Sequence, residues 1–137
     1  MGKPLQTLVA VFAVSFLLNY VWEHLHSVLY VHYKGGAITD AILLHATLMD
    51  AVMITGLAVA LLFIPRVRRK PWLVLVGAFL LAAGIELWAL DTGRWAYNAS
   101  MPLVPLLHVG LSPTVQLALT GFVTFKICLK KFTVWGS

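Results

Sequence analysis

Charged residues and cysteine are both scarce in this chain of 137 residues. Only 11% of the residues are charged, against about a quarter in a typical soluble domain, which excludes an ordinary water-soluble globule. The single cysteine, Cys128, has no partner for an internal disulfide, a CxxC redox pair or a cysteine-based zinc site. Apolar residues take the place of charge, because 61% of the chain is hydrophobic. This composition predicts a protein that lies in lipid.

Long apolar segments dominate the sequence. A helix needs about 20 mostly apolar residues to cross a bilayer, and four segments reach or approach that length: 7–30, 41–64, 72–90 and 113–129. No small-x-small cleavage site follows the first segment, so we expect an uncleaved span. Ser112-Pro113 is typical of a helix start, with serine as the cap. The sequence predicts a single transmembrane domain over residues 1–137, an all-α integral membrane four-helix bundle.

The basic residues predict the direction of each helix. Only Lys34 and Arg94 fall on one side of the four spans. The other side holds Lys3, Arg66, Arg68, Arg69, Lys70, Lys126, Lys130 and Lys131. Lysine and arginine in short loops favour the cytoplasmic side, so both termini are expected in the cytoplasm. The net charge of +5 is explained by this orientation and predicts no nucleic-acid partner.

Residues 91–112 form an unusually long connection between the third and fourth spans. Most helix connections are shorter, and long ones are often ordered or functional. The segment MPLVPLLHVGL is too apolar to extend into water. We therefore expect an ordered outer loop that lies along the membrane interface or folds back onto the bundle.

Polar residues follow one face of the first span. They recur at steps of three or four, the spacing that aligns side chains on a helix, and Trp22 flanks them. The residues are Ser15, Asn19, Glu23, His26 and Tyr30. An ionisable side chain in the middle of a bilayer costs roughly 2.5–3.5 kcal/mol. This face is therefore expected to point into the bundle.

Each span contributes one polar residue at a similar depth: Glu23, Asp50, Glu86 and Gln116. With alternating helix directions, all four fall on the outer side of the midplane, within about 10 Å in depth. We interpret this layer as a functional site, and the alternative is a hydrogen-bonded layer that only joins the helices. The surrounding pocket is expected to include Asn19, Trp22, His26, Tyr30, His45, Asp91, Arg94, Trp95, Tyr97, His108 and Gln116.

Three neighbouring carboxyl groups favour acid/base chemistry. Glu23, Asp50 and Glu86 cannot all ionise at low cost in a low dielectric, so at least one is expected to hold a proton near neutral pH. A protonated and an ionised carboxyl group form an acid/base pair. Such a pair would protonate a double bond or move a proton on a lipid or isoprenoid-like substrate. His26, His45 and Asp91 would tune or orient it, and Arg94 would pair with Asp91 or with an anionic headgroup.

The aromatic residues near the predicted site have two possible interpretations. Trp22, Trp88, Trp95, Tyr30 and Tyr97 would form the walls of a pocket for an apolar substrate or a carbocation. The alternative is an interfacial aromatic belt, which membrane proteins commonly carry.

Several other functions stay open at this point. Glu23-x-x-His26 has the spacing of di-iron bundles, but Glu86 is followed by Leu-Trp-Ala and no second copy exists, so no metal is predicted. His26, His45 and His108 are candidate haem ligands, although no spacing selects two of them, and the cofactor stays undetermined. The remaining alternative is a non-enzymatic binding, transport or accessory subunit, as a homo-oligomer or in a larger membrane complex.

Three segments carry a resemblance: NYVWEHLHSVLY, HATLMDA, and ELWALDTGRWAYNASMPLVPLLHVGLSP followed by Gln116. Together they resemble a family of small bacterial inner-membrane proteins, with TGRWAY and MPLVP as the most specific parts. The resemblance covers most of the chain. It implies a four-helix protein of the bacterial inner membrane, and it implies no activity and assigns no catalytic residue.

Overall fold

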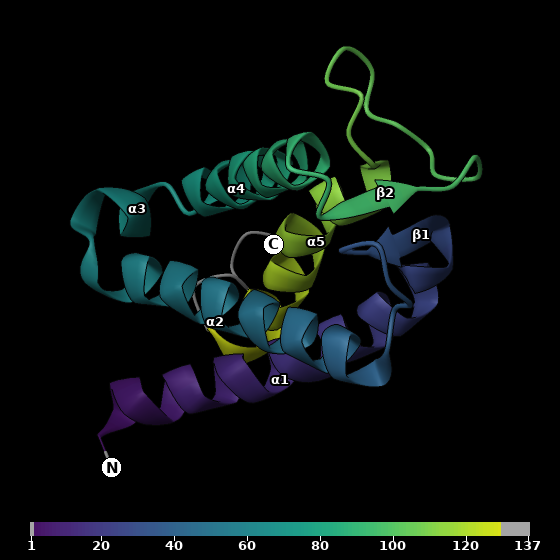
Figure 1. Cartoon of the computed structure of the whole chain (residues 1–137). Helices are drawn as coiled ribbons and strands as arrows, with labels where there is room; N and C mark the ends of the chain where they lie inside the picture. Colours follow the sequence, from purple (N-terminus) through teal and green to yellow (C-terminus); the bar gives the residue numbers. More distant parts are fainter. Residues whose placement is uncertain (1, 130–137) are drawn as a thin grey trace.

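The computed structural model describes residues 2–129 and is mainly helical (Figure 1). Its elements are α1 (Lys3–His26), the 3-10 turn η1 (Ser27–Leu29), β1 (Tyr30–Tyr33), α2 (Asp40–Phe63), α3 (Pro65–Arg69), α4 (Trp72–Asp91), β2 (Trp95–Tyr97) and α5 (Leu111–Cys128). The prediction of four helices long and apolar enough to cross a membrane is confirmed: α1 with η1, α2, α4 and α5. Short α3 and the two strands were not predicted.

The helix boundaries have local causes. Thr39 caps α2 by accepting a hydrogen bond from the backbone NH of Ile42 at 3.3 Å. One residue, Ile64, separates the end of α2 from Pro65, which opens α3 as a first-turn proline. The expected cap of α5 is wrong, because Gly110 precedes that helix and Ser112 lies inside its first turn. The Ser112 hydroxyl contacts His26 instead, which ties the start of α5 to α1.

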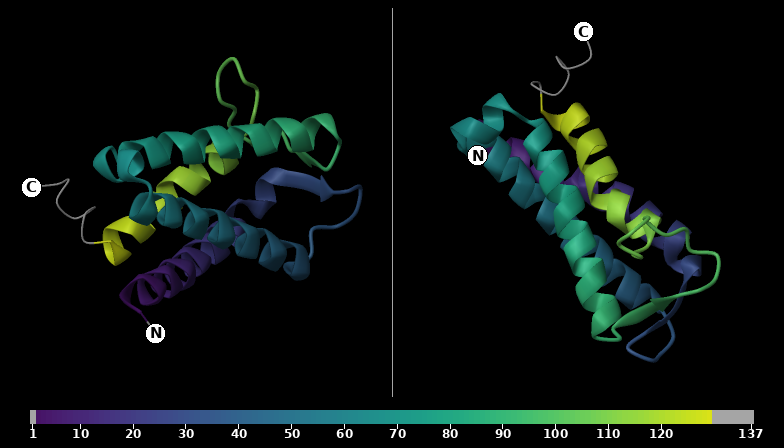
Figure 2. Two further views of the ribbon diagram at one scale, coloured as in Figure 1. Left: turned by 90° about the vertical axis from the view of Figure 1, so that its left-hand side faces the viewer. Right: turned by 90° about the horizontal axis from the view of Figure 1, so that it is seen from above.

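The long helices pack mainly as two pairs, α1 with α2 and α4 with α5, and α5 also contacts α1. The start of α1, the short α3 and the end of α5 lie at one end of the bundle, and β1 and β2 lie at the other (Figure 2). An apolar core fills the part of the bundle nearer α3 and includes Val11, Ile54, Ala58, Val74, Ala78 and Phe125. Small residues such as Ala58 and Ala78 allow the helices to approach closely.

Strands β1 and β2 form a short antiparallel pair that joins the first and third connections. Tyr30 pairs with Tyr97 and Tyr33 with Trp95, and the register shifts between Tyr30 and His32. Aromatic and β-branched residues favour strands, which suits these segments. The pairing brings the residues that follow α1 next to those that follow α4.

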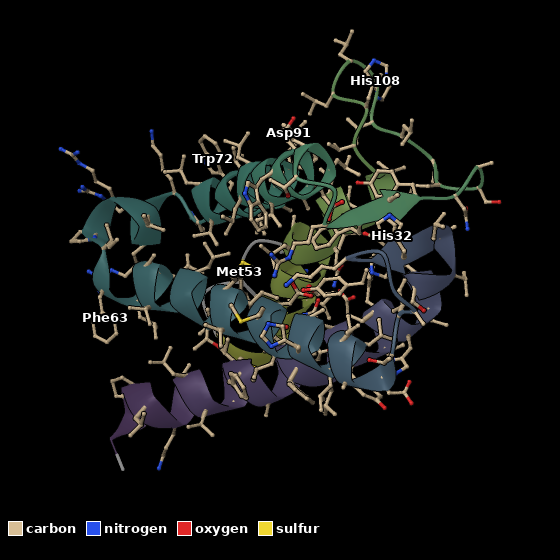
Figure 3. All side chains as sticks on the ribbon, viewed as in Figure 1. His32, Met53, Phe63, Trp72, Asp91 and His108 are labelled. Carbon is tan, nitrogen blue, oxygen red and sulfur yellow. The ribbon has the colours of Figure 1, made fainter. Side chains whose placement is uncertain are left out.

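The rest of the long connection, residues 98–110, folds back at its base and projects at its tip. Met101 and Val109 are buried, whereas Leu106 is 93% exposed. Leu106 and His108 both have positive φ, at 71° and 56°. Figure 3 shows His108 on the part of the loop that points away from the helices.

Candidate functional site

The side-chain amide of Gln116 lies at the centre of a polar cluster. Its Nε2 donates to Glu23 Oε1 at 2.7 Å, to Asp50 Oδ2 at 2.8 Å and to Asn19 Oδ1 at 3.0 Å. Glu23, Asn19 and Gln116 are buried, and Asp50 is partly buried. An amide NH₂ has only two hydrogens, so three oxygens share two donors. The cluster joins α1, α2 and α5. Three acceptor oxygens surround the Gln116 nitrogen, which carries only two hydrogens.

The polar face of α1 supplies one side of this cluster, and its predicted direction is confirmed. Ser15, Asn19, Glu23 and His26 are the buried polar residues of α1, and they lie at steps of four and three along the helix. On α5 the same spacing places Thr120 one turn after Gln116, and the Thr120 hydroxyl donates to Asn19 Oδ1 at 3.2 Å. Thr120 was not predicted, although its spacing from Gln116 would have indicated it.

His26 connects Glu23 to α5. Its Nε2 lies 3.3 Å from Glu23 Oε2, and its Nδ1 lies 3.0 Å from Ser112 Oγ. The imidazole also meets the Tyr30 ring edge-on, with centroids 5.4 Å apart. Both ring nitrogens are therefore engaged within the protein, and the ring fixes the orientation of the Glu23 carboxyl group.

Glu86 of α4 is held separately, by β2. The Trp95 indole donates to Glu86 Oε2 at 3.1 Å, and the Tyr97 hydroxyl donates to the same oxygen. Tyr97 accepts in turn from the backbone NH of Gly110 at 2.9 Å. Burial, and then the hydrogen bond to Glu86, raise the pKa of Tyr97, so its hydroxyl keeps the proton that it donates.

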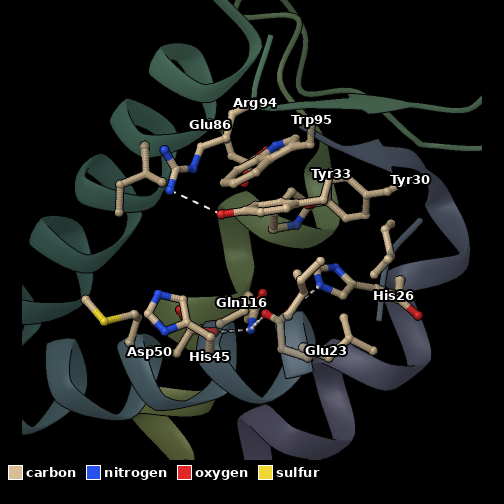
Figure 4. Close-up of a pocket in the computed structure, with 18 of the residues that line it drawn as sticks. Glu23, His26, Tyr30, Tyr33, His45, Asp50, Glu86, Arg94, Trp95 and Gln116 are labelled. Atoms are coloured by element: carbon tan, nitrogen blue, oxygen red, sulfur yellow. Dashed lines mark hydrogen bonds and ion pairs between the residues drawn. The ribbon is translucent and has the colours of Figure 1, made fainter. Parts of the chain in front are cut away.

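A cavity of about 590 Å³ lies between α2 and α4. Glu23, Asp50 and Gln116 line one side of it, and Glu86 lines the other together with Trp95 and Arg94 (Figure 4). Most of the remaining lining is apolar and includes Ile38, Ile42, Met49, Met53, Ala82, Ile85 and Leu117. Met49 and Trp88, one from each helix, are 45% and 52% exposed. The cavity therefore opens sideways between α2 and α4.

Most predicted site residues lie in or directly behind this cavity. Its lining includes Glu23, His26, Tyr30, His45, Asp50, Glu86, Arg94, Trp95 and Gln116. Asn19 and Tyr97 lie behind it, hydrogen-bonded to Gln116 and Glu86. Tyr33, His32 and Ser27 also line it, and the sequence had not indicated them.

Three predicted residues are not brought into the cavity. Asp91 is exposed, because five residues after Glu86 the helix has turned well away from that face. His108 is exposed on the projecting loop. Trp22 packs beside His26 outside the cavity lining, and its buried indole NH has no hydrogen-bond partner among residues 2–129.

Arg94 does not pair with Asp91, the first of the two partners expected for it. Its guanidinium donates to the Tyr33 hydroxyl at 3.1 Å and lies over the rings of Trp88 and Tyr33. The ion pairs of the described residues are His24 with Asp40 and His26 with Glu23.

The described part of the chain contains no group of three or more His, Cys, Asp and Glu side chains placed to hold a metal ion. Of the three candidate haem ligands, His26 has both ring nitrogens engaged and His108 lies outside the cavity. His45 lines the cavity and is exposed. No two of these three histidines therefore have free imidazoles that lie together as a pair of haem ligands.

The sequence matches no protein-family profile, no curated protein and no solved structure. The site itself consists of two clustered carboxyl groups and one separate carboxyl group, which face an apolar cavity from different helices.

Proposed function

We propose that the protein is a membrane-embedded acid/base enzyme that moves a proton on a lipid or isoprenoid-like substrate. One observation carries this proposal. An apolar cavity has carboxyl groups on two sides, Glu23 and Asp50 on one and Glu86 on the other. An apolar substrate in this cavity would lie between two sets of proton-transfer groups.

Glu23 and Asp50 form the proposed acid. Their oxygens accept hydrogen bonds from the same Gln116 nitrogen, so the two carboxyl groups lie side by side. Two adjacent carboxylates in a low dielectric repel each other, and a shared proton removes the repulsion. The pair therefore holds one proton that it can deliver to a substrate atom in the cavity.

Glu86 forms the proposed base. It accepts hydrogen bonds from the Trp95 indole and the Tyr97 hydroxyl, and both donors stabilise its carboxylate form against the cost of burying a charge. These bonds also fix the carboxylate so that it faces the cavity from α4.

The proposed reaction is redox-neutral. The Glu23–Asp50 pair delivers a proton to one carbon of a carbon–carbon double bond, and positive charge develops on the neighbouring carbon. Glu86 then removes a proton from a carbon next to that charge, and the double bond moves by one position. One proton enters the substrate and one leaves it, so no oxidant, reductant or co-substrate is required. The rings of Tyr30, Tyr33 and Trp95 line the cavity and would stabilise the transient cation.

The proposed location is the bacterial inner membrane, with both termini in the cytoplasm and the cavity in the outer half. The basic residues Lys3, Arg66, Arg68 and Arg69 support this orientation, because their elements lie at the end of the bundle opposite β1 and β2. Lys34 and Arg94 lie at the strand end. Lys130 and Lys131 fall outside the described residues.

Deuterium transfer from solvent to carbon tests the chemistry directly. The full-length protein is reconstituted in lipid nanodiscs in D₂O with a polyprenol and a polyprenyl phosphate as probes, and carbon-bound deuterium is measured by mass spectrometry. We expect incorporation by the native protein and at least about a hundredfold loss in Glu23→Gln, Asp50→Asn and Glu86→Gln. Asp40→Asn is the matched control, because that carboxylate is 99% exposed at the start of α2.

Thermal unfolding of each variant separates catalysis from stability. A structural layer would make the three cavity variants unstable. The proposal is refuted if the folded native protein places no deuterium on carbon, or if folded variants of all three carboxyl groups retain the native rate.

A further inference from the structure

We propose that Arg94 binds an oxyanion headgroup, so that the substrate is an anionic amphiphile whose unsaturated chain occupies the cavity. The assignment of the chain to a reacting substrate rests on the proposed function. The headgroup site itself stands on separate contacts, all at the strand end of the cavity.

The Arg94 side chain is held in place before any ligand binds. Its guanidinium carbon lies 5.1 Å from the ring centroid of Trp88 and 5.6 Å from that of Tyr33. The backbone is fixed as well: Arg94 N donates to Ala89 O at 2.8 Å, and Lys34 N donates to Arg94 O at 2.6 Å. A guanidinium that already contacts two rings loses little freedom when it binds a planar or tetrahedral oxyanion.

The positive charge of Arg94 has no anionic partner within the described chain. The guanidinium has five N–H donors, and Tyr33 is its one side-chain acceptor among residues 2–129. The neighbouring carboxylate of Glu86 is occupied by Trp95 and Tyr97. A partly buried cation beside an apolar cavity is stabilised when a ligand supplies the counter-charge.

A second cation lies close to the tyrosine that Arg94 contacts. The Lys34 ammonium is 5.5 Å from the Tyr33 ring centroid, so both cations of the strand end contact the same tyrosine. His32 of β1 lines the cavity nearby and adds a further donor. This concentration of positive and donor groups favours a phosphate or carboxylate headgroup over a neutral one.

The shape of the cavity relates this headgroup site to the carboxyl groups. Arg94, Tyr33 and His32 line its strand end, whereas Met53 and Ala82 lie about one helical turn beyond Asp50 and Glu86. An amphiphile with its headgroup on Arg94 would therefore extend its chain past both sets of carboxyl groups. A free phosphate would leave the apolar part of the cavity unfilled, which is why we assign the site to an amphiphile.

Three probes test the assignment without requiring turnover. Dodecyl phosphate, dodecanol and inorganic phosphate are titrated into the protein in phosphatidylcholine nanodiscs, with binding followed by tryptophan fluorescence, since Trp88 contacts Arg94. We expect dodecyl phosphate to bind at least about tenfold more tightly than dodecanol and to weaken with added salt. Arg94→Gln should remove this preference and leave dodecanol binding unchanged.

Two further variants control for folding and charge. Arg68→Gln removes a cation from α3 at the other end of the bundle and should leave all affinities unchanged. Arg94→Lys retains the charge without the planar fork and should restore part of the preference. If Arg94→Gln fails to fold, Arg94→Lys and the salt dependence of the native protein decide the question.

Each opposing result has a defined meaning. Equal affinities for dodecyl phosphate and dodecanol, or an unaffected Arg94→Gln variant, would overturn the headgroup site. Inorganic phosphate that binds as tightly as dodecyl phosphate would replace it with a site for free oxyanion. Complete competition by phosphatidylglycerol in the nanodisc would assign the site to bulk membrane lipid and overturn the substrate role. The catalytic role of the carboxyl groups is measured by deuterium transfer, which the binding assay does not use, so the catalytic proposal can fail while this binding result holds.

Discussion

Replacing Gln116 with leucine tests whether one side-chain amide joins three helices. The amide NH₂ serves oxygens of Asn19, Glu23 and Asp50, and Gln116 is 4% exposed. Two N–H groups make at most two full hydrogen bonds. Bonds to charged groups contribute about 1.5–3 kcal/mol each in soluble proteins, whereas interhelical bonds in membranes average about 0.6 kcal/mol. Leucine is close to glutamine in size, so the loss of stability comes mainly from these hydrogen bonds. Between the two magnitudes per bond, we expect a loss of about 2 kcal/mol in the free energy of unfolding.

Gln116→Glu sharpens the same test. It keeps the shape, removes both donors and adds a third carboxyl group beside Glu23 and Asp50. At pH 8 we expect this variant to be less stable than Gln116→Leu, and the difference should shrink as acid protonates the cluster. Unfolding by SDS in mixed micelles, followed by circular dichroism, gives the free energies. Leu119→Ala on the same helix is the control, because Leu119 is 49% exposed on the outside of the bundle.

The refuting results are specific. Gln116→Leu with native stability would show that the amide does not join α1, α2 and α5. Gln116→Glu with the same stability as Gln116→Leu at both pH values would show that the Glu23 and Asp50 carboxyl groups do not interact with a third charge at this position. The second result would also remove the physical basis of the proposed acid.

Two further predictions concern the segment around β2. Burial, and then Glu86, raise the pKa of Tyr97, so the stability that Tyr97 contributes is complete below its ordinary value of about pH 10 and is lost as the pH rises above it. Tyr97→Phe should flatten the alkaline fall in thermal stability above pH 10, and an unchanged profile would contradict this. Gly110→Ala should destabilise the protein by about 1–3 kcal/mol, because its Cβ would lie 2.9 Å from Met101 Sδ and 3.0 Å from Pro113 Cδ. Gly84→Ala meets no atom within 4 Å and should be neutral or slightly stabilising in the same thermal assay.

Hydropathy and helical spacing were sufficient to predict the four helices and much of the cluster. The steps between Asn19, Glu23 and His26 already determine a common helix face. Depth along alternating helices then predicted that Glu23, Asp50 and Gln116 would meet, which their hydrogen bonds confirm. The common face and the shared depth both follow from regular helix geometry, which the sequence specifies well.

The surroundings of Glu86 required information that the sequence pattern does not contain. Depth alone placed it with the other three residues, whereas it faces them from across the cavity and accepts hydrogen bonds from Trp95 and Tyr97. Those donors reach it because β1 pairs with β2, and strands of four and three residues are too short for a clear alternating pattern. The exposed position of Asp91 has a simpler cause, since a residue at a helix end can share a depth with the site and still face away from it.

The pairing of β1 with β2 therefore links the proposed base to the proposed headgroup site. Trp95 and Tyr97 lie two residues apart, so their side chains leave the same face of β2, and both bond to Glu86. Arg94 directly precedes them and is tied to β1 through Lys34 and Tyr33. The strand pair thus fixes the distance between the guanidinium and the Glu86 carboxylate. An enzyme built in this way would select substrates by the number of carbon atoms between the headgroup and the reacting double bond, because neither site can move without the other.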